Sequence, residues 1–296
     1  MHPLPRGGMP RRTARQQNRL YGDLAWTWPI VSPPEDYVDE AEEHWRTLER
    51  HARRPVRTLL HLGCGGGHLD RSLKRHCALT GVDVSPAMLG LAKGLNPAVT
   101  YAEGDMRTAR LGRTFDAVLI ADSIAYMCTE SDLLAAFRTA FAHLRPGGAF
   151  LTYVEQTPEA FREGRSTSVV RTRGGTEITF LENLHDPDPR DTTFESRFLY
   201  LIREGGRLRI ERDLHTCGIF PLAAWERLLR RAGFQPLRVA NRDQGQHGEA
   251  VVTFVGLRPA TRPRPSGAVR PTAGRRRNSR RRTAQGSRRR PSRSRL

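Results

Sequence analysis

Hydrophobic positions in the first half of the chain form short apolar runs separated by stretches with helical periodicity. The runs predict strands near residues 57–62, 78–83, 98–102, 115–121 and 148–155, and the stretches between them predict helices near 68–75, 86–93 and 131–143. Residues 36–52 predict a further amphipathic helix ahead of the first strand, with Ser32 or Asp36 as its N-cap. Alternating strands and helices are typical of a parallel sheet that helices cover on both faces.

The pattern changes to period-two alternation after Glu155. Four antiparallel strands are predicted at residues 168–173, 177–184, 192–202 and 207–214, joined by glycine pairs and a proline-rich loop. A helix at 222–232 and strands near 235–241 and 249–257 complete the pattern. We therefore expect an α/β fold: a Rossmann-like, doubly wound seven-stranded sheet with an antiparallel β lid inserted before its last helix and hairpin.

Residues 58–68 carry the strongest chemical signal, because they combine a buried strand, a glycine-rich turn and the start of a helix. Gly63, Gly65 and Gly67 have no side chain, so a ligand can lie against the backbone and meet the free N–H groups of the helix. Asp83 ends the next strand 20 residues after Gly63, where nucleotide-binding units place a ribose-binding carboxylate. The pattern predicts an adenosine-containing cofactor, while the spacing breaks the dinucleotide fingerprint and a triphosphate-loop lysine is absent.

This glycine-rich stretch resembles motif I of the class I S-adenosylmethionine-dependent methyltransferases. The resemblance covers residues 56–155 and continues in order through segments 81–89, 103–106, 115–120 and 143–150. It implies S-adenosyl-L-methionine as the cofactor and no metal. The cofactor-binding residues that it implies are Tyr21, His61, Gly63, Cys64, Gly65, Gly67, Asp83, Val84, Met88, Asp105, Met106 and Ala121.

The family resemblance also implies a role for several of these residues. The three glycines would hold the methionine part of the cofactor, and Asp83 both ribose hydroxyls. Val84 or Met88 would pack on the adenine ring, while Asp105 would accept a hydrogen bond from its amino group and the Met106 backbone would donate one. Ala121, with Asp122, would approach the transferable methyl group.

His61 departs from the family pattern, which usually has Asp or Glu at this position. That acid supports the glycine loop and the amino group of the cofactor. A neutral histidine can still accept a hydrogen bond there. The departure leaves this one contact in question.

The reaction that the family performs is an in-line displacement at a methyl carbon, for which the protein must align the nucleophile and exclude water. A base is needed only if the nucleophile arrives protonated. Candidates for a base or a substrate-orienting group are Tyr126, His215 and Asp122, followed by His185 and Glu155. Each has a structural alternative, such as a hydrogen-bonded core histidine for His215 or a turn residue for Asp122.

Three aromatic residues, Tyr21, Trp26 and Trp28, precede the first helix. Family members often fold such a segment over the cofactor, where an aromatic ring gains from attraction to a sulfonium. Plain packing against the lid is the alternative. The lid itself resembles, more weakly, that of small-molecule methyltransferases, including glycine and aminosugar N-methyltransferases, some of which carry a histidine near the position of Tyr126.

The formal net charge of +18 is concentrated at the ends of the chain. Residues 258–296 hold 15 arginines and residues 1–18 hold four, without an acid, so residues 19–257 are left with a net charge of −1. Such ends have almost nothing apolar to bury and are predicted to be disordered. The arginine tail is either an electrostatic grip on nucleic acid or a solvated extension without a major role.

The sequence thus divides into six segments. They are a disordered basic N-terminus (1–18), an N-terminal helical segment covering the active site (19–55), the cofactor-binding core (56–155), the antiparallel lid (156–220), a final helix and hairpin (221–257), and a disordered arginine-rich tail (258–296). Four scattered cysteines and the absence of a long apolar run favour a cytoplasmic protein without a membrane segment.

The leading interpretation is a methyltransferase, monomeric or homodimeric, that methylates N or O of a small-molecule acceptor. The first alternative is an RNA or DNA methyltransferase that uses the arginine tail. Residues 121–124 lack the proline pair used on exocyclic base amines, which counts against it. The second alternative is a non-catalytic cofactor-binding protein, in which His61 has disabled the site.

Overall fold

The computed structural model describes residues 18–240 and 251–260. The predicted disorder of residues 1–17 and of the arginine tail beyond residue 260 lies outside this part of the chain. Everything stated below concerns the described residues.

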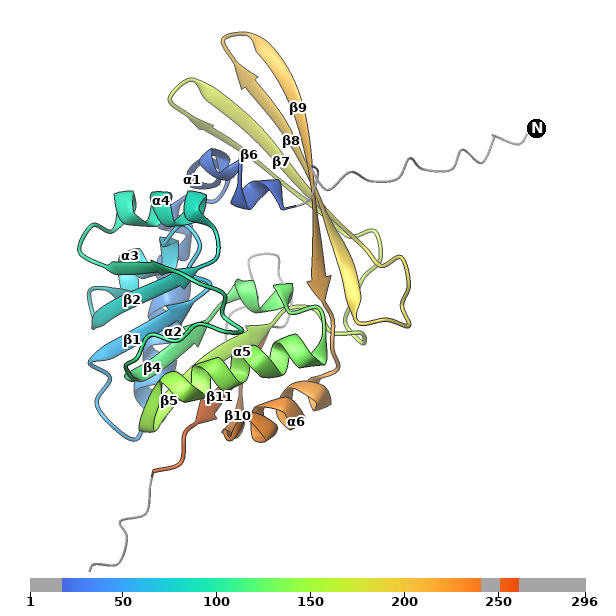
Figure 1. Ribbon diagram of the computed structural model, residues 1–296. Helices are drawn as coiled ribbons and strands as arrows, with labels where there is room; N and C mark the ends of the chain where they lie inside the picture. The colour runs from blue at the N-terminus through green and yellow to red at the C-terminus, as the bar shows by residue number, and fades with distance from the viewer. Residues whose placement is uncertain (1–17, 241–250, 261–296) are drawn as a thin grey trace, which may run out of the picture. The chain divides into compact units, whose positions relative to one another are not determined.

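Seven strands form the core sheet, in the order β10-β11-β5-β4-β1-β2-β3 (Figure 1). Their bounds are β1 Thr58–Leu62, β2 Ala78–Asp83, β3 Thr100–Glu103, β4 Phe115–Ile120, β5 Leu144–Val154, β10 Gln235–Ala240 and β11 Val252–Leu257. Strands β1 to β5 pair in parallel, whereas β11 pairs antiparallel with both β5 and β10. The expected Rossmann-like seven-stranded sheet is confirmed.

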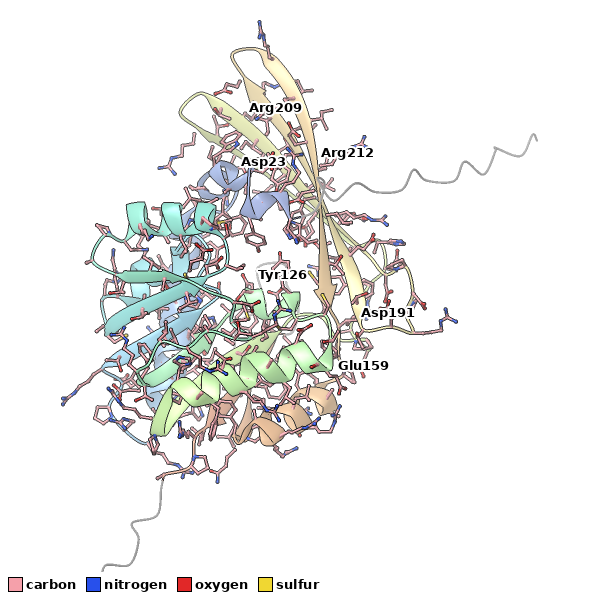
Figure 2. The ribbon with its side chains drawn as sticks, in the orientation of Figure 1. Asp23, Tyr126, Glu159, Asp191, Arg209 and Arg212 are labelled. Carbon is pink, nitrogen blue, oxygen red and sulfur yellow. The ribbon has the colours of Figure 1, made fainter. Side chains whose placement is uncertain are left out.

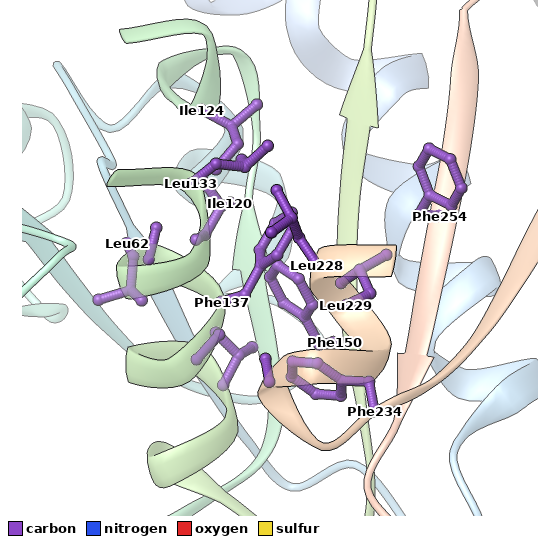
Figure 3. Close-up of a cluster of buried hydrophobic side chains, with 14 of the residues drawn as sticks. Leu62, Ile120, Ile124, Leu133, Phe137, Phe150, Leu228, Leu229, Phe234 and Phe254 are labelled. Atoms are coloured by element: carbon purple, nitrogen blue, oxygen red, sulfur yellow. The ribbon is translucent and has the colours of Figure 1, made fainter. Parts of the chain in front are cut away.

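Helices cover both faces of this sheet, because successive residues of β1 point to opposite sides. Leu60 and Leu62 pack against α5 (Glu130–His143) and α6 (Leu222–Ala232), through side chains such as Phe137 and Leu228 (Figure 3). Leu59 faces the other way, toward α2 (Val38–His51) and α3 (His68–Leu73). The remaining core helix, α4 (Pro86–Leu95), follows β2.

The predicted helix over 36–52 packs against the sheet as α2, but its expected N-cap is wrong. A 3₁₀ turn, η4 (Pro34–Tyr37), comes first, with Pro33 as its N-cap and Pro34 as its first residue. Neither end residue of α2 makes a side-chain cap. The Ser32 hydroxyl instead lies 2.7 Å from the Tyr37 hydroxyl.

Four long strands form a separate antiparallel sheet in the order β6-β7-β8-β9, which we call the lid. They are β6 Ser166–Arg173, β7 Thr176–His185, β8 Thr193–Glu204 and β9 Arg207–Gly218. Two of its hairpins turn at glycine pairs 174–175 and 205–206, all with positive φ, which suits the twist of paired strands.

The segment before α2 packs under the lid as three short turns, η2 (Arg19–Tyr21), η3 (Ala25–Thr27) and α1 (Trp28–Val31). Leu24 and Val31 join Ile178, Tyr200 and Ile202 of the lid in one buried cluster. None of the helices in residues 18–240 and 251–260 combines the length and the apolar composition needed to cross a membrane.

Candidate active site

The glycine loop after β1 is shaped by its three predicted glycines, which all have positive φ. A Cβ on Gly63 would come 2.1 Å from the Ser123 hydroxyl oxygen, and one on Gly67 would come 2.8 Å from the Tyr101 hydroxyl. Gly65 has no atom within 4 Å of that position. The outer two glycines therefore allow close packing inside the protein, while the middle one faces open space where a ligand can lie against the backbone.

Asp83, at the end of β2, faces the same loop. Its carboxylate accepts hydrogen bonds from the Gly65 N–H and the Ser85 N–H, both at 2.8 Å. Burial raises the pKa of Asp83, although these backbone donors work against the rise. A carboxylate at the mouth of an open glycine turn fits the ribose of an adenosine-containing cofactor.

Val84, rather than Met88, offers an apolar surface for the adenine ring. The Val84 side chain is 66% exposed beside Asp83. Met88 is 1% exposed and packs with Leu20 and Ala25, so it has no free surface for a ligand. The sequence left both residues open, and only the packing of the N-terminal segment on α4 separates them.

Asp105 is held by a neighbour that the sequence analysis did not consider. Both of its carboxylate oxygens accept hydrogen bonds from the Arg107 guanidinium, at 2.6–3.1 Å, and Arg107 also pairs with Asp132. The hydrogen bonds from Arg107 lower the pKa of Asp105. The contact to adenine stays a prediction, and it has to coexist with this ion pair.

Met106 lies close to the glycine loop, and Ala121 follows β4. The Met106 side chain is 2.8 Å from the position of a Gly63 Cβ. Ala121 is buried at the end of β4, directly before η5 (Asp122–Tyr126). Their contacts with the cofactor stay predictions.

His61 is paired with a carboxylate that the sequence analysis missed. Its Nδ1 lies 2.6 Å from Asp70 Oδ1, and the other oxygen of Asp70 accepts from the Tyr101 hydroxyl at 2.9 Å. Both side chains of the pair are almost without solvent contact, at 2% and 0% exposed. Asp70 on α3 thus holds the imidazole of His61 beneath the loop, and His61 Nε2 is left buried without a partner. The sequence did carry a signal for this pair, because Asp70 lies between Leu69 and Leu73 on a helix that packs against the sheet.

Cys64 lies beneath the loop as a neutral thiol. Burial raises its pKa well above the ordinary value, and the charges of Asp70 and Asp83 add to the effect. The thiol therefore packs as a small apolar group instead of acting as a nucleophile.

A cavity of about 870 Å³ lies among the N-terminal segment, α2, the carboxyl ends of β4 and β5, and the lid. Tyr21, Asp122, Tyr126 and Glu155 all line it. Figure 2 shows Tyr126 between the core helices and the lid strands. A volume of this size suits a small-molecule ligand.

Two hydroxyls and a histidine meet at this cavity. The Tyr21 hydroxyl donates to the Tyr126 hydroxyl at 2.9 Å, and the Tyr126 hydroxyl lies 2.6 Å from His215 Nδ1. His215 Nε2 lies 2.7 Å from Asp213 Oδ2, and neither of these two side chains has any exposed area. The predicted His215 therefore reaches the cavity only through Tyr126, and is not in contact with a bound acceptor.

Asp213 was missed as a site residue, although the sequence carried a signal for it. Residues two apart in a strand point to the same face, so Asp213 and His215 on β9 had to lie together. Tyr126 could be anticipated only as a residue after the fourth strand.

Asp122 and Glu155 face the water of the cavity from its core side. Desolvation, followed by the charge of Glu40, raises the pKa of both groups, that of Glu155 to about 7. The charge of Glu182 raises both pKa values further. Five further acidic side chains line the cavity, those of Asp36, Asp39, Glu40, Glu43 and Glu182, so a cationic guest would be favoured there, and it would in turn favour the ionised form of Asp122 and Glu155.

The three aromatic residues of the N-terminal segment have different neighbours, although Tyr21 and Trp28 both pack against the cluster of Leu20, Ala25 and Met88. Trp28 stacks on His68 beside the glycine loop, with ring centroids 5.9 Å apart. Trp26 is 38% exposed under the Arg209 guanidinium, whereas Tyr21 and Trp28 both line the cavity. The successive turns of η2, η3 and α1 point the rings in different directions. His185, the other candidate, pairs with Glu163 at 2.6 Å.

Comparison with known proteins agrees with this geometry. The model of a family described as a methyltransferase domain matches residues 59–148. A dTDP-3-amino-3,4,6-trideoxy-α-D-glucopyranose N,N-dimethyltransferase of Streptomyces venezuelae is 32% identical over 225 residues, which cover 75% of this chain and 91% of the relative. The chain belongs to the class I S-adenosylmethionine-dependent methyltransferases.

Other relatives of this methyltransferase agree. A dTDP-3-amino-3,6-dideoxy-α-D-glucopyranose N,N-dimethyltransferase of Streptomyces fradiae is 28% identical and covers 75% of the chain and 87% of the relative. The solved structure of the sugar N-methyltransferase KedS8 from Streptoalloteichus superimposes with a TM-score of 0.69 at 26% identity, covering 88% of this chain and all of the other. The methyltransferase uses S-adenosyl-L-methionine, which supplies a methyl group on a sulfonium, and transfers that group to a small-molecule acceptor.

Proposed function

We propose that this methyltransferase methylates the amino nitrogen of a nucleotide-linked amino sugar. The observation that carries the proposal is the excess of acidic side chains around the cavity, whose lining holds more carboxyl than guanidinium groups: Asp36, Asp39, Glu40, Glu43, Asp122, Glu155 and Glu182 against Arg165 and Arg171. A sugar amine is a cation in water near neutral pH, so these carboxylates attract it into the cavity. A hydroxyl acceptor would gain nothing from them.

The lid side of the same cavity carries positive charge. Arg165 and Arg171 both line it, and Arg171 pairs with Asp36 at 2.9 Å. Guanidinium groups suit the diphosphate of a nucleotide sugar. An acceptor that carries both an ammonium and a diphosphate would meet acidic and basic side chains in this cavity, and the relatives described above act on acceptors of this kind.

We assign the remaining roles on the same basis. Gly65 and its neighbours hold the methionine part of the cofactor, with His61 and Cys64 beneath them. Asp83 binds the ribose and Val84 packs on the adenine. Alignment of the amine with the methyl group by Tyr21, Tyr126 and Asp122 can supply on the order of 7–11 kcal/mol of the barrier.

The direct test is methyl transfer to dTDP-3-amino-3,6-dideoxy-α-D-glucopyranose, followed by mass spectrometry. We expect products carrying one and two added methyl groups. The matched control is the same nucleotide sugar with a hydroxyl in place of the amine, which should stay unmethylated. Methylation of the hydroxyl control alone would refute the proposal. Calorimetric titration of S-adenosylhomocysteine into wild type and Asp83→Ala shows independently whether the cofactor site is intact.

A further inference from the structure

Four side chains from three distant segments form one continuous chain of hydrogen bonds between the cavity and the inside of the lid. Tyr21 comes from η2, Tyr126 from η5, and His215 and Asp213 from β9, and the contacts are 2.9, 2.6 and 2.7 Å. Alignment of an acceptor uses only the first two of these side chains. Substrate binding does not account for the buried half of this hydrogen-bond chain, which is formed by His215 and Asp213.

We propose that this chain is a proton relay that takes the proton from the acceptor ammonium before methyl transfer, with Asp213 as the positioning residue that sets its direction. The proposal rests on the proposed function, because an amine acceptor arrives protonated and a neutral acceptor does not.

Asp213, the carboxylate at the buried end, sets the direction of every hydrogen bond in the relay. An ionised Asp213 only accepts hydrogen bonds, so His215 Nε2 must carry its proton. Nδ1 of the neutral ring is then an acceptor, and the Tyr126 hydroxyl must donate to it. The Tyr126 oxygen can in turn accept from Tyr21, which leaves the Tyr21 oxygen with lone pairs available to the acceptor nitrogen.

The structure keeps Asp213 ionised. Burial alone would raise the pKa of this carboxyl, but the hydrogen bond from His215 and those from backbone N–H groups bring it below the ordinary value. The Leu20 N–H donates to Oδ2 at 2.7 Å and the Leu214 N–H to Oδ1 at 2.8 Å. An imidazolium forming at His215 would therefore meet a negative partner in direct contact.

The other groups that face His215 carry no positive charge that would oppose a positive charge on its ring. The Phe198 ring lies 4.3 Å away between centroids, and Ser196 is the cross-strand neighbour on β8. Ser196 in turn donates to the carboxylate of Glu182 on β7. Cys217, two residues along β9, is a neutral thiol because burial raises its pKa.

The tyrosine pair is enclosed by acidic groups. Burial raises the pKa of Tyr21 and Tyr126, and Asp83 and Asp122 add to the rise at Tyr21 as Asp213 does at Tyr126. Neither phenol is therefore a stable anion, and each passes a proton on as it receives one.

The first member of the relay is also anchored to the cofactor site. The Ser85 hydroxyl donates to the Tyr21 carbonyl oxygen at 2.7 Å, and the Ser85 N–H donates to Asp83. The residue expected to bind the ribose thus positions the backbone of the residue that meets the amine. This places the end of the relay near the reacting nitrogen.

The step balances as follows. The ammonium gives one proton to Tyr21, Tyr21 passes its own to Tyr126, and Tyr126 passes its own to His215 Nδ1. The free amine pair then forms the N–C bond while the C–S bond breaks, with its electrons remaining on sulfur. The product leaves as a methylammonium, and the relay returns its proton to water through Tyr21 when the cavity empties.

The first test reads the relay without any acceptor. Nitrogen-15 spectra of histidine-labelled full-length protein at pH 7, with the His215 signal assigned by its loss in His215→Gln, should show a neutral ring protonated at Nε2. Asp213→Asn, whose amide can donate, should move the proton to Nδ1 in part or in full. A wild-type ring protonated at Nδ1 would overturn the proposal.

The second test is the pH dependence of turnover with dTDP-3-amino-3,6-dideoxy-α-D-glucopyranose. Asp213→Asn should lower kcat about 100-fold at pH 7, within the range of general-base effects, with little change in KM. The loss should shrink at high pH, where the amine is already neutral in solution. Tyr126→Phe should behave in the same way.

Tyr200→Phe is the matched control, because Tyr200 is a buried lid tyrosine whose hydroxyl has no partner. It should keep wild-type turnover. An equal loss in Asp213→Asn at every pH would mean a structural role and overturn the relay. Failure of the proposed function would show differently, as wild-type protein that binds S-adenosylhomocysteine but leaves the amine unmethylated at every pH, and this would remove the relay's substrate as well.

Discussion

Restoring the family's usual acid at position 61 should destabilise this protein. In His61→Asp the new carboxylate would face Asp70 at a site where the present pair is 2.6 Å apart and only 2% and 0% exposed. The Tyr101 hydroxyl donates a hydrogen bond to one oxygen of Asp70, but in the variant no group replaces the imidazole as donor to the other oxygen. Breaking a buried pair costs about 3–5 kcal/mol. For a chain of this size that corresponds to a fall in Tm of roughly 10 °C.

The loss of unfolding free energy in His61→Asp should depend on pH. The folded variant has to hold one proton between the two carboxylates, whereas the unfolded chain releases both above about pH 5. The folded state then binds more protons, so its free energy of unfolding falls as pH rises. Urea titrations followed by circular dichroism should show a penalty that is largest at pH 8 and smaller at pH 5.

Two further variants separate charge from shape. His61→Asn retains a donor and should cost less than His61→Asp. The double variant of His61→Asp with Asp70→Asn removes one carboxylate and supplies an amide donor, and should recover much of the loss. A penalty in His61→Asp that stays constant between pH 5 and pH 8 would refute the reasoning, since it would then arise from packing alone.

Four other substitutions test the cofactor site and the lid. Asp83→Asn should weaken S-adenosylhomocysteine binding in calorimetry by at least tenfold, and wild-type affinity should fall toward acidic pH, because burial raises the pKa of a carboxyl that must be ionised to bind. Gly63→Ala should lower Tm, since its Cβ overlaps Ser123, whereas Gly65→Ala should cost about 1 kcal/mol of stability but block the cofactor. Tyr200→Phe should leave Tm unchanged or raise it, because it removes a buried hydroxyl without a partner.

Much of the fold was predictable because local sequence patterns specify its strands and helices. Runs of apolar residues and the glycines between them place β1, β2 and β4 within one or two residues of their observed bounds. Helix α6 matches its prediction at both ends, since Gly233 with φ of 108° stops it. The N-cap of α2 was missed because a 3₁₀ turn precedes this helix, and periodicity does not register it.

Only those site residues that are close together in the sequence could be predicted to lie together. The glycine loop and Asp83 are consecutive parts of one strand-turn-helix-strand unit, so their spacing alone brings them together. Met88, by contrast, is covered by Leu20 and Ala25 of the N-terminal segment, 63 or more residues earlier in the chain. No local signal could report that contact.

The sequence by itself determined the core sheet, the lid strands and the chemistry of the cofactor loop, because short-range periodicity and turn geometry specify them. Tertiary structure alone decided that Tyr21 donates to Tyr126, 105 residues away, and that Tyr126 meets His215 on a strand 89 residues further on. It also decided that Asp70 pairs with His61 beneath the glycine loop. Hydrogen bonds between distant segments depend on how layers pack, and a buried polar group becomes costly or useful only once its partners are in place.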